Sequence, residues 1–151
     1  MIIRAATLDD VPALVRLSSM MHAESAYSKF EFIPAKMEFN FINWISDPGS
    51  WFVCVAESSE KQIIGAYCGY ITEYMFGSDI LAYDMGLFVD PSKRGGMAAI
   101  RLIKAFENWA QFKNAKEVCP GTTTMVASDR TSKLYEKLGY KVVGSIFKKE
   151  V

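Results

Sequence analysis

Hydrophobic residues recur at intervals of three or four in two stretches of the first fifty positions. This interval places them on one face of an α-helix. The residues of the two faces are Leu14, Leu17 and Met21, and then Met37, Phe41, Trp44 and Ile45. Thr7 is placed to cap the first helix, and the acidic residues 9 and 10 suit its first turn. The second helix is predicted to begin at Pro34 and to end at the turn 47–49.

The middle of the chain has a different pattern, rich in β-branched and aromatic residues. Three such stretches, 51–56, 63–74 and 81–89, are separated by short polar breaks. They are predicted to be strands of an antiparallel meander, because short connections join antiparallel neighbours. A further short strand is predicted at 2–6, before the first helix.

Helical spacing returns at 97–113 and again at 132–138, where Gly139 is expected to end the helix. A weak strand is predicted at 117–122, interrupted by a Pro-Gly pair, and a final strand at 140–148, where the residues alternate. The predicted order is β-α-α-β-β-β-α-β-α-β. The sequence has no internal repeat and no linker, so the chain is predicted to be one α/β domain over residues 1–151, with helices around a mixed sheet.

Charge and composition narrow the range of functions. The 17 Lys and Arg balance the 17 Asp and Glu exactly in number, and half of the 151 residues are apolar. Disorder is excluded by this apolar content, and a dedicated nucleic-acid binder would carry a basic excess. No apolar run is long enough to span a membrane, and the N-terminus does not resemble a signal peptide. We therefore expect a soluble cytoplasmic protein with neither nucleic acid nor membrane as partner.

Metal and disulfide chemistry are not expected. Cys54, Cys68 and Cys119 are widely spaced and odd in number, as is typical of reduced thiols in a cytosolic protein. A single histidine, His22, cannot build a zinc site of the usual His and Cys type. His22 lies near the end of the first predicted helix. Two roles are open for it there, a contact with the substrate or a simple interaction with the helix dipole.

The segment 87–99 is the most informative part of the sequence. A strand ends near Pro91, a loop containing Gly95 and Gly96 follows, and a long helix begins at once. The first N–H groups of a helix have no partner within it, so this arrangement suits an anion such as a phosphate. The loop matches neither the ATPase nor the dinucleotide fingerprint. The positive charges near it are Lys93, Arg94, Arg101 and Lys104. An ordinary strand-to-helix turn is the alternative.

This strand-loop-helix unit resembles the acyl-CoA site of the GNAT superfamily of N-acyltransferases. The matching residues are Leu87, Val89, Pro91, Arg94 and Ala99, while Met97 stands where the family usually has a loop glycine. The resemblance implies that acetyl-CoA is the co-substrate and that no metal is used. The coenzyme-binding residues it implies are Leu87, Phe88, Val89, Arg94, Gly95, Gly96, Met97, Ala98 and Ala99. The loop would bind the pyrophosphate, and the backbone of residues 88 and 89 would pair with the pantetheine arm.

A second segment, Leu134 to Tyr140, resembles the family's Leu-Tyr-Glu-Lys-x-Gly-Phe/Tyr motif. The resemblance implies that the Tyr135 hydroxyl protonates the departing thiolate. Ser128 and Thr131 replace the asparagine and alanine that the family often has upstream. The order of predicted elements is also the topology of the family.

The general base is less well defined by the sequence. The positions where the family often has a carboxylate are Tyr83 and Met85, and neither can serve. Asp84 lies between them and would face the other side of a regular strand, unless a β-bulge turns it inward. Glu73 on the neighbouring strand is the second candidate.

The resemblance implies an N-acetyltransferase that passes acetyl directly to a primary amine of a small molecule or peptide. A non-catalytic acyl-CoA sensor or scaffold is the alternative, favoured by Met85 and Ser128. Six aromatic residues are candidates for lining an acceptor cleft, with packing in the core as the alternative. They are Tyr27, Phe30, Phe32, Tyr70, Tyr74 and Phe76. A homodimer is expected from the habit of the family.

Overall fold

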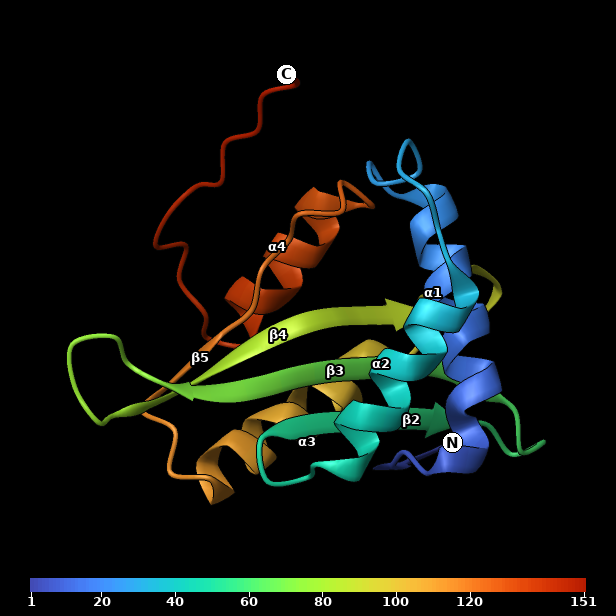
Figure 1. Ribbon diagram of the computed structural model, residues 1–151, viewed down its shortest axis with the longest axis horizontal. Coiled ribbons are helices and arrows are strands. Elements are labelled where there is room, and N and C mark those ends of the chain that lie inside the picture. Colours follow the sequence, from blue (N-terminus) through green and yellow to red (C-terminus); the bar gives the residue numbers. More distant parts are fainter.

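The computed structural model describes residues 1–151 as a five-stranded sheet with helices on both faces (Figure 1). Two short 3-10 turns precede the first and the third helix. None of the helices combines the length and apolarity that a membrane span requires. The elements in chain order are β1 (Ile2–Ala5), η1 (Leu8–Asp10), α1 (Val11–Glu24), α2 (Pro34–Ser46), β2 (Trp51–Glu57), β3 (Ile63–Glu73), β4 (Ile80–Val89), η2 (Pro91–Lys93), α3 (Ala98–Phe112), β5 (Glu117–Cys119) and α4 (Ser128–Lys137).

The strands lie in the sheet in the same order as in the sequence, from β1 to β5. The first four are antiparallel to their neighbours, which confirms the predicted meander. β5 is parallel to β4, because α3 carries the chain back across the sheet before β5 begins. This single parallel pair makes the sheet mixed, as predicted.

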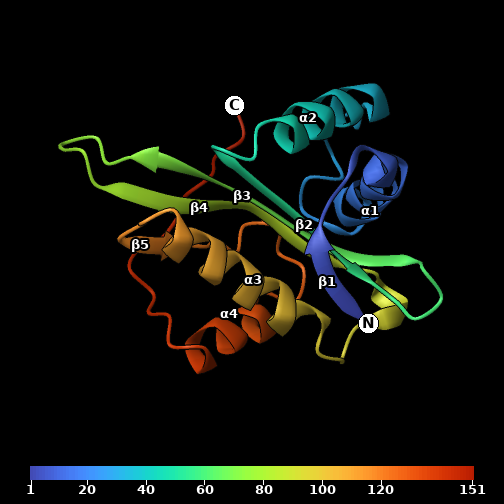
Figure 2. The same ribbon diagram turned by 90° about the horizontal axis from the view of Figure 1, so that it is seen from below.

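Each face of the sheet has its own hydrophobic core (Figure 2). α1 and α2 cover one face with the predicted residues Leu14, Leu17 and Phe41, which are almost fully buried. α3 covers the opposite face with Leu102 and Phe106, and α4 packs beside it. Each buried side chain of this size contributes about 2 kcal/mol to folding. The periodicity therefore identified the buried helical faces correctly.

The predicted final strand at 140–148 is wrong. These residues form no regular element, and the chain leaves the end of α4 without joining the sheet (Figure 1). Val143 and Phe147 are 97% and 92% exposed. The adjacent edge strand, β5, is only three residues long and is followed directly by Pro120, so a nine-residue strand finds no edge of matching length to bond with. α4 also begins four residues earlier than predicted, at Ser128.

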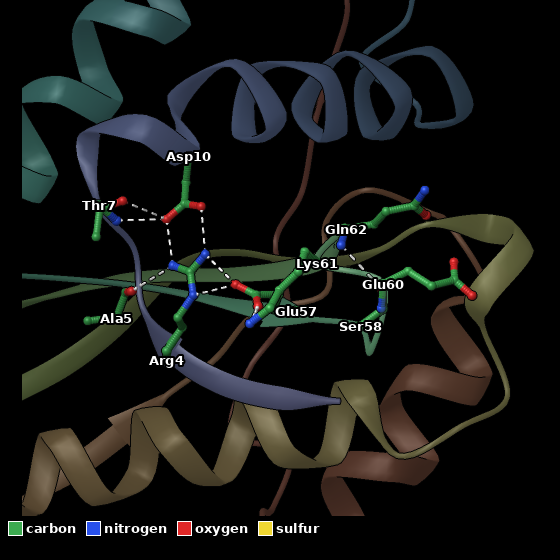
Figure 3. A network of polar contacts seen from close by, with 9 residues as sticks. All are labelled: Arg4, Ala5, Thr7, Asp10, Glu57, Ser58, Glu60, Lys61 and Gln62. Atoms are coloured by element: carbon green, nitrogen blue, oxygen red, sulfur yellow. Dashed lines mark hydrogen bonds and ion pairs between the residues drawn. The ribbon is translucent and has the colours of Figure 1, made fainter.

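A charged network ties β1 to the start of α1 and to the end of β2 (Figure 3). The Arg4 guanidinium donates to both oxygens of Asp10, at 2.7 and 2.9 Å, and to Glu57 at 2.7 Å. Both carboxylates are only 6% exposed. Thr7 caps η1 rather than α1, and its backbone N–H donates to the Asp10 carboxylate at 2.8 Å. Hydrogen bonds from Arg4 hold the pKa of Asp10 below its ordinary value.

Replacing Arg4 by methionine is expected to lower the free energy of unfolding by about 2 kcal/mol at pH 7, because buried Asp10 loses its countercharge. Urea denaturation measures the change. The difference should shrink as the pH falls below about 4, where the Asp10 carboxyl of the unfolded state becomes protonated, and it should vanish once folded Asp10 is protonated as well. Lys29→Met, which removes the cation of an exposed ion pair with Glu150, should cost less than about 0.5 kcal/mol. Equal costs for the two variants would contradict this reading.

Candidate active site

β4 and β5 separate soon after they meet, and a cavity opens between them. They pair only from Leu81 to Tyr83, opposite residues 117–119. β4 runs on to Val89, whereas β5 ends at Cys119, so the edge of β4 from residue 84 onward has no strand beside it. This edge lines a cavity of about 1260 Å³. Its free backbone N–H and C=O groups are available to an extended ligand.

Most of the residues predicted for coenzyme binding and catalysis come together around this cavity. Those that line it are Asp84, Leu87, Phe88, Val89, Arg94, Gly95, Gly96, Ala98, Ala99 and Tyr135. Met97 is the exception, because it is 52% exposed and lies outside the lining. The two predicted catalytic side chains, from β4 and α4, therefore share one cavity with the start of α3.

A β-bulge in β4 accompanies the placement of Asp84. Cys68 pairs with Gly86, but the next residue of β3, Gly69, pairs with Asp84, so Met85 is an extra residue without a partner. A bulge in this strand is the condition under which Asp84 was predicted to turn inward. Asp84 lines the cavity, and its directly paired partner Gly69 fixes the face on which it lies.

The Asp84 carboxyl is held in a poorly solvated position. The backbone N–H of Gly121, just after β5, donates to its Oδ1 at 2.8 Å. Burial raises the pKa of Asp84 to about 6, from an ordinary value of 3.8, against the opposing effect of this hydrogen bond. A carboxylate with a raised pKa is a stronger proton acceptor at neutral pH than an ordinary aspartate.

Tyr135 lies on α4, across the cavity from β4. Its side chain is 7% exposed and packs edge-on against Tyr140, with 5.1 Å between ring centroids. Burial, followed by the nearby Asp84 charge, raises the pKa of Tyr135 well above its ordinary value. The hydroxyl is therefore protonated over the whole physiological range, as a proton donor must be.

The loop before α3 leaves its backbone open to the cavity. Gly95 has a φ of +94°, and a Cβ atom built there would meet nothing within 4 Å. No side chain caps the first turn of α3, so its N–H groups keep their free donors and the positive end of the helix dipole. These are the features that a pyrophosphate group requires. The residues present therefore fit the coenzyme.

Arg94 crosses from this loop to α1. Its guanidinium forms an ion pair with the Glu24 carboxylate, donates to the backbone oxygen of Val89 at 2.9 Å, and lies 5.2 Å from the Phe88 ring centroid. Glu24 is the last residue of α1. The contact joins the loop before α3 to the start of the segment between α1 and α2.

Several other candidates lie away from the cavity. Glu73 is exposed at the end of β3, and His22 packs against Phe32, with 5.3 Å between ring centroids. Neither lines the cavity. Of the four predicted positive charges, only Lys93 and Arg94 line it.

Sequence reasoning missed two parts of the cavity wall. The first is a row of basic residues on α4, Arg130, Lys133 and Lys137, all of which line the cavity. Their spacing of three and four places them on one helical face, a signal that the sequence contained.

The second part is the set of contacts between the segment after α1 and residues 123 and 124. Of the six aromatic residues predicted for an acceptor cleft, two line the cavity, Tyr27 and Tyr70, and four do not, Phe30, Phe32, Tyr74 and Phe76. The sequence did not reveal the partners of Tyr27. The backbone N–H of Ala26 donates to the Thr124 oxygen at 2.9 Å, and the Tyr27 hydroxyl donates to Thr123 at 2.7 Å. Lys148 donates in turn to the Tyr27 oxygen at 3.0 Å. These contacts join segments about a hundred residues apart, so no local pattern signals them. Tyr70 and Tyr83 line the same cavity and stack at 5.8 Å.

Comparison with known proteins connects this geometry to a family. The sequence matches the model of the acetyltransferase (GNAT) domain over residues 48–142. This range includes β4 with its bulge, the loop before α3, and Tyr135. No curated protein matches the sequence.

Solved structures with the same fold include acetyltransferases. Glucosamine-6-phosphate N-acetyltransferase from Arabidopsis thaliana has a TM-score of 0.78 at 14% identity, covering 99% of this chain and 97% of its own. An acetyltransferase of Trypanosoma brucei has a TM-score of 0.74 at 16% identity, covering 99% of both chains. A transcriptional regulator from Bacillus halodurans C-125 has a TM-score of 0.82 at 19% identity, also covering 99% of both. At these identities the likeness shows the fold, whereas the domain match identifies the family: the chain belongs to the GNAT acetyltransferases.

Proposed function

We propose that this acyltransferase is an N-acetyltransferase, which transfers acetyl from acetyl-CoA directly to a primary amine of a small molecule or peptide. The observation that carries the proposal is that Asp84 and Tyr135 line one cavity that extends to the open first turn of α3. A proton acceptor, a proton donor and an anion site are the three groups that this reaction needs.

The coenzyme is proposed to lie along β4 and α3. The N–H groups from Arg94 to Ala99 bind the pyrophosphate, and the edge of β4 at Phe88 and Val89 pairs with the pantetheine arm. The basic row on α4, Arg130, Lys133 and Lys137, lines the same cavity and supplies positive charge for further phosphate oxygens. Because this charge is local, the chain needs no overall basic excess.

Asp84 is proposed as the general base. An ordinary alkyl ammonium has a pKa of about 10.4, so the amine reaches the site mostly protonated. Only the neutral amine has the lone pair that attacks, so the ammonium first gives one proton to water. Once the nitrogen of the neutral amine bonds to the acetyl carbon, it carries a positive charge and releases a second proton readily. Asp84, with a pKa of about 6, is ionised at neutral pH and accepts that proton directly or through a water molecule.

Tyr135 is proposed as the general acid that protonates the departing thiolate. A thiol has a pKa of about 8.5, below that of Tyr135, so the transfer needs help. Asp84 supplies part of it, because its negative charge is one cause of the raised pKa of Tyr135 and disappears when Asp84 takes the amine proton. The two proton transfers therefore assist each other.

The acceptor is proposed to approach from the end of the cavity that Tyr27, Tyr70 and Tyr83 line. Aromatic faces attract an ammonium group, and the Asp84 carboxylate lies in the same cavity. Both features favour a cationic amine over a neutral or anionic acceptor.

The test is thiol release from acetyl-CoA in the presence of polyamines, amino acids, aminoglycosides and peptides. At least one amine should release coenzyme A faster than acetyl-CoA hydrolyses alone, and mass spectrometry should find the acceptor heavier by one acetyl group. Binding of acetyl-CoA, measured by thermal shift, without release from any amine would overturn the proposal.

The ion pair between Glu24 and Arg94 gives a prediction for coenzyme binding. Glu24→Gln should tighten the binding of coenzyme A about threefold. In the wild type Arg94 breaks its ion pair with Glu24 before it contacts the pyrophosphate, and the variant has no such pair to break. Isothermal titration calorimetry at low salt measures the change. Glu31→Gln removes the same charge from an exposed position in the following segment, and should leave the affinity unchanged. A weaker affinity in Glu24→Gln would contradict the prediction.

A further inference from the structure

Tyr67, in the middle of β3, carries a hydroxyl that the fold buries without a partner. The side chain is fully buried, and its oxygen makes no hydrogen bond within the protein. An unpartnered buried hydroxyl costs free energy that a phenylalanine would avoid. Packing therefore explains the ring of Tyr67 but not its hydroxyl.

The ring of Tyr67 is held in place on two sides. Phe106 of α3 stacks on it at 4.7 Å between centroids, and Phe52 packs against it at 6.3 Å. Gly69 makes the approach of Phe106 possible, because a Cβ atom there would lie 2.5 Å from that ring. The Tyr67 hydroxyl is therefore presented in a defined direction.

The strand pairing and the core packing place Tyr67 beside the two proposed catalytic groups. Tyr67 and Gly69 are two residues apart on β3 and share a face, and Gly69 pairs with Asp84. Tyr135 belongs to the same core cluster as Tyr67. Burial and the neighbouring Tyr135 and Asp84 raise the pKa of Tyr67, so it remains a protonated donor.

The proposed reaction needs a donor at this place. When Tyr135 gives up its proton, a negative charge develops on its oxygen in a poorly solvated part of the protein, which is costly without a hydrogen-bond donor. Hydrogen bonds of this kind are often long before the reaction and tighten only in the transition state.

We propose that Tyr67 is a positioning residue for Tyr135. The Tyr67 hydroxyl donates a hydrogen bond to the Tyr135 oxygen as that oxygen loses its proton. This rests on the proposed function. The O–H bond of Tyr135 breaks, an S–H bond forms on the departing coenzyme A, and the electron pair stays on the Tyr135 oxygen. The proton that Asp84 took from the amine then restores the Tyr135 hydroxyl, so the net transfer is one proton from amine to thiol.

The test is Tyr67→Phe, assayed with acetyl-CoA and the amine that gives the fastest thiol release in the panel above. We expect kcat to fall about a hundredfold, as when one donor to a developing oxyanion is removed. The KM for acetyl-CoA and the affinity for coenzyme A should change by no more than about twofold, and the Tm should be equal or higher. In a Tyr135→Phe background the same substitution should cause no further loss of kcat.

Tyr74→Phe is the matched control, because Tyr74 directly follows β3 and lies outside the cavity. It should behave as the wild type. Two results would overturn this inference while leaving the proposed function in place. One is an unchanged kcat in Tyr67→Phe. The other is a double variant in which the kcat losses of Tyr67→Phe and Tyr135→Phe combine in full. If the wild-type protein binds coenzyme A but none of the amines in the panel causes thiol release, both the inference and the proposed function are overturned.

Discussion

Replacing Tyr135 by phenylalanine is expected to lower kcat by two to three orders of magnitude, about the contribution of a well-placed general acid. Coenzyme A affinity should change by no more than about threefold, because the ring and its edge-on contact with Tyr140 remain. A loss confined to kcat identifies an interaction that forms only in the transition state. Steady-state kinetics and calorimetry on the same preparation separate the two quantities.

Tyr140→Phe is the control for this experiment. Tyr140 packs against Tyr135 but does not line the cavity, so the variant removes a neighbouring hydroxyl without removing the proposed acid. It should retain most of the wild-type kcat. If both variants lose the same activity, the hydroxyl of Tyr135 has no special role and the assignment is wrong.

An acyl donor with a more acidic thiol gives a further test of the same assignment. A thiolate that leaves easily needs less proton transfer in the transition state, so the penalty of Tyr135→Phe should shrink with such a donor. A penalty that does not depend on the leaving group would indicate that Tyr135 serves packing alone.

The sequence predicted elements well where neighbouring residues decide them. The buried faces of α1, α2 and α3 follow from residues three and four apart, and the meander follows from short polar turns. The segment 140–148 failed because its alternating pattern is local, whereas a strand needs a neighbouring edge. That edge, β5, lasts only from Glu117 to Cys119. Whether a partner edge exists is settled by distant parts of the chain.

The site divides in the same way. The family motifs drew attention to Arg94 and Tyr135, which both line the cavity, because each motif is a short continuous segment. Asp84 depended on a bulge opposite Cys68 and Gly69, which periodicity alone cannot reveal. The Glu24 partner of Arg94 lies 70 positions away in the sequence, and the buried neighbourhood of Tyr67 requires three elements at once.

Replacing Asp84 by asparagine is expected to lower kcat/KM by about a thousandfold at pH 7.5, because the variant has no group to accept the amine proton. Asparagine keeps an oxygen that can accept the 2.8 Å hydrogen bond from Gly121, so the local structure should persist. The amine loses its own proton before it attacks, so kcat/KM should rise with pH in both proteins, and the wild-type profile should show an additional break at about pH 6, where Asp84 ionises. This break should be absent in the variant.

The stability of the same variant should change in the opposite direction. The folded pKa of about 6 lies above the ordinary value of 3.8, so ionised Asp84 opposes folding at neutral pH. A difference of about two pKa units corresponds to about 3 kcal/mol, which Asp84→Asn should recover at pH 7. As the pH falls, the carboxyl becomes protonated first in the folded state and then, below 3.8, in the unfolded state, so the gain should vanish well below pH 3.8. Chemical denaturation at about pH 3 and pH 7 measures both values.

Glu73→Gln distinguishes a catalytic carboxylate from a merely nearby one. Glu73 was the other candidate base, and it is exposed at the end of the adjacent strand, outside the cavity. This variant should change neither kcat/KM nor the free energy of unfolding appreciably. Loss of activity in Glu73→Gln with full activity in Asp84→Asn would reverse the assignment. Loss of activity together with a gain in stability, seen in Asp84→Asn alone, is the pattern expected of a carboxylate that the fold keeps poorly solvated because the reaction requires it.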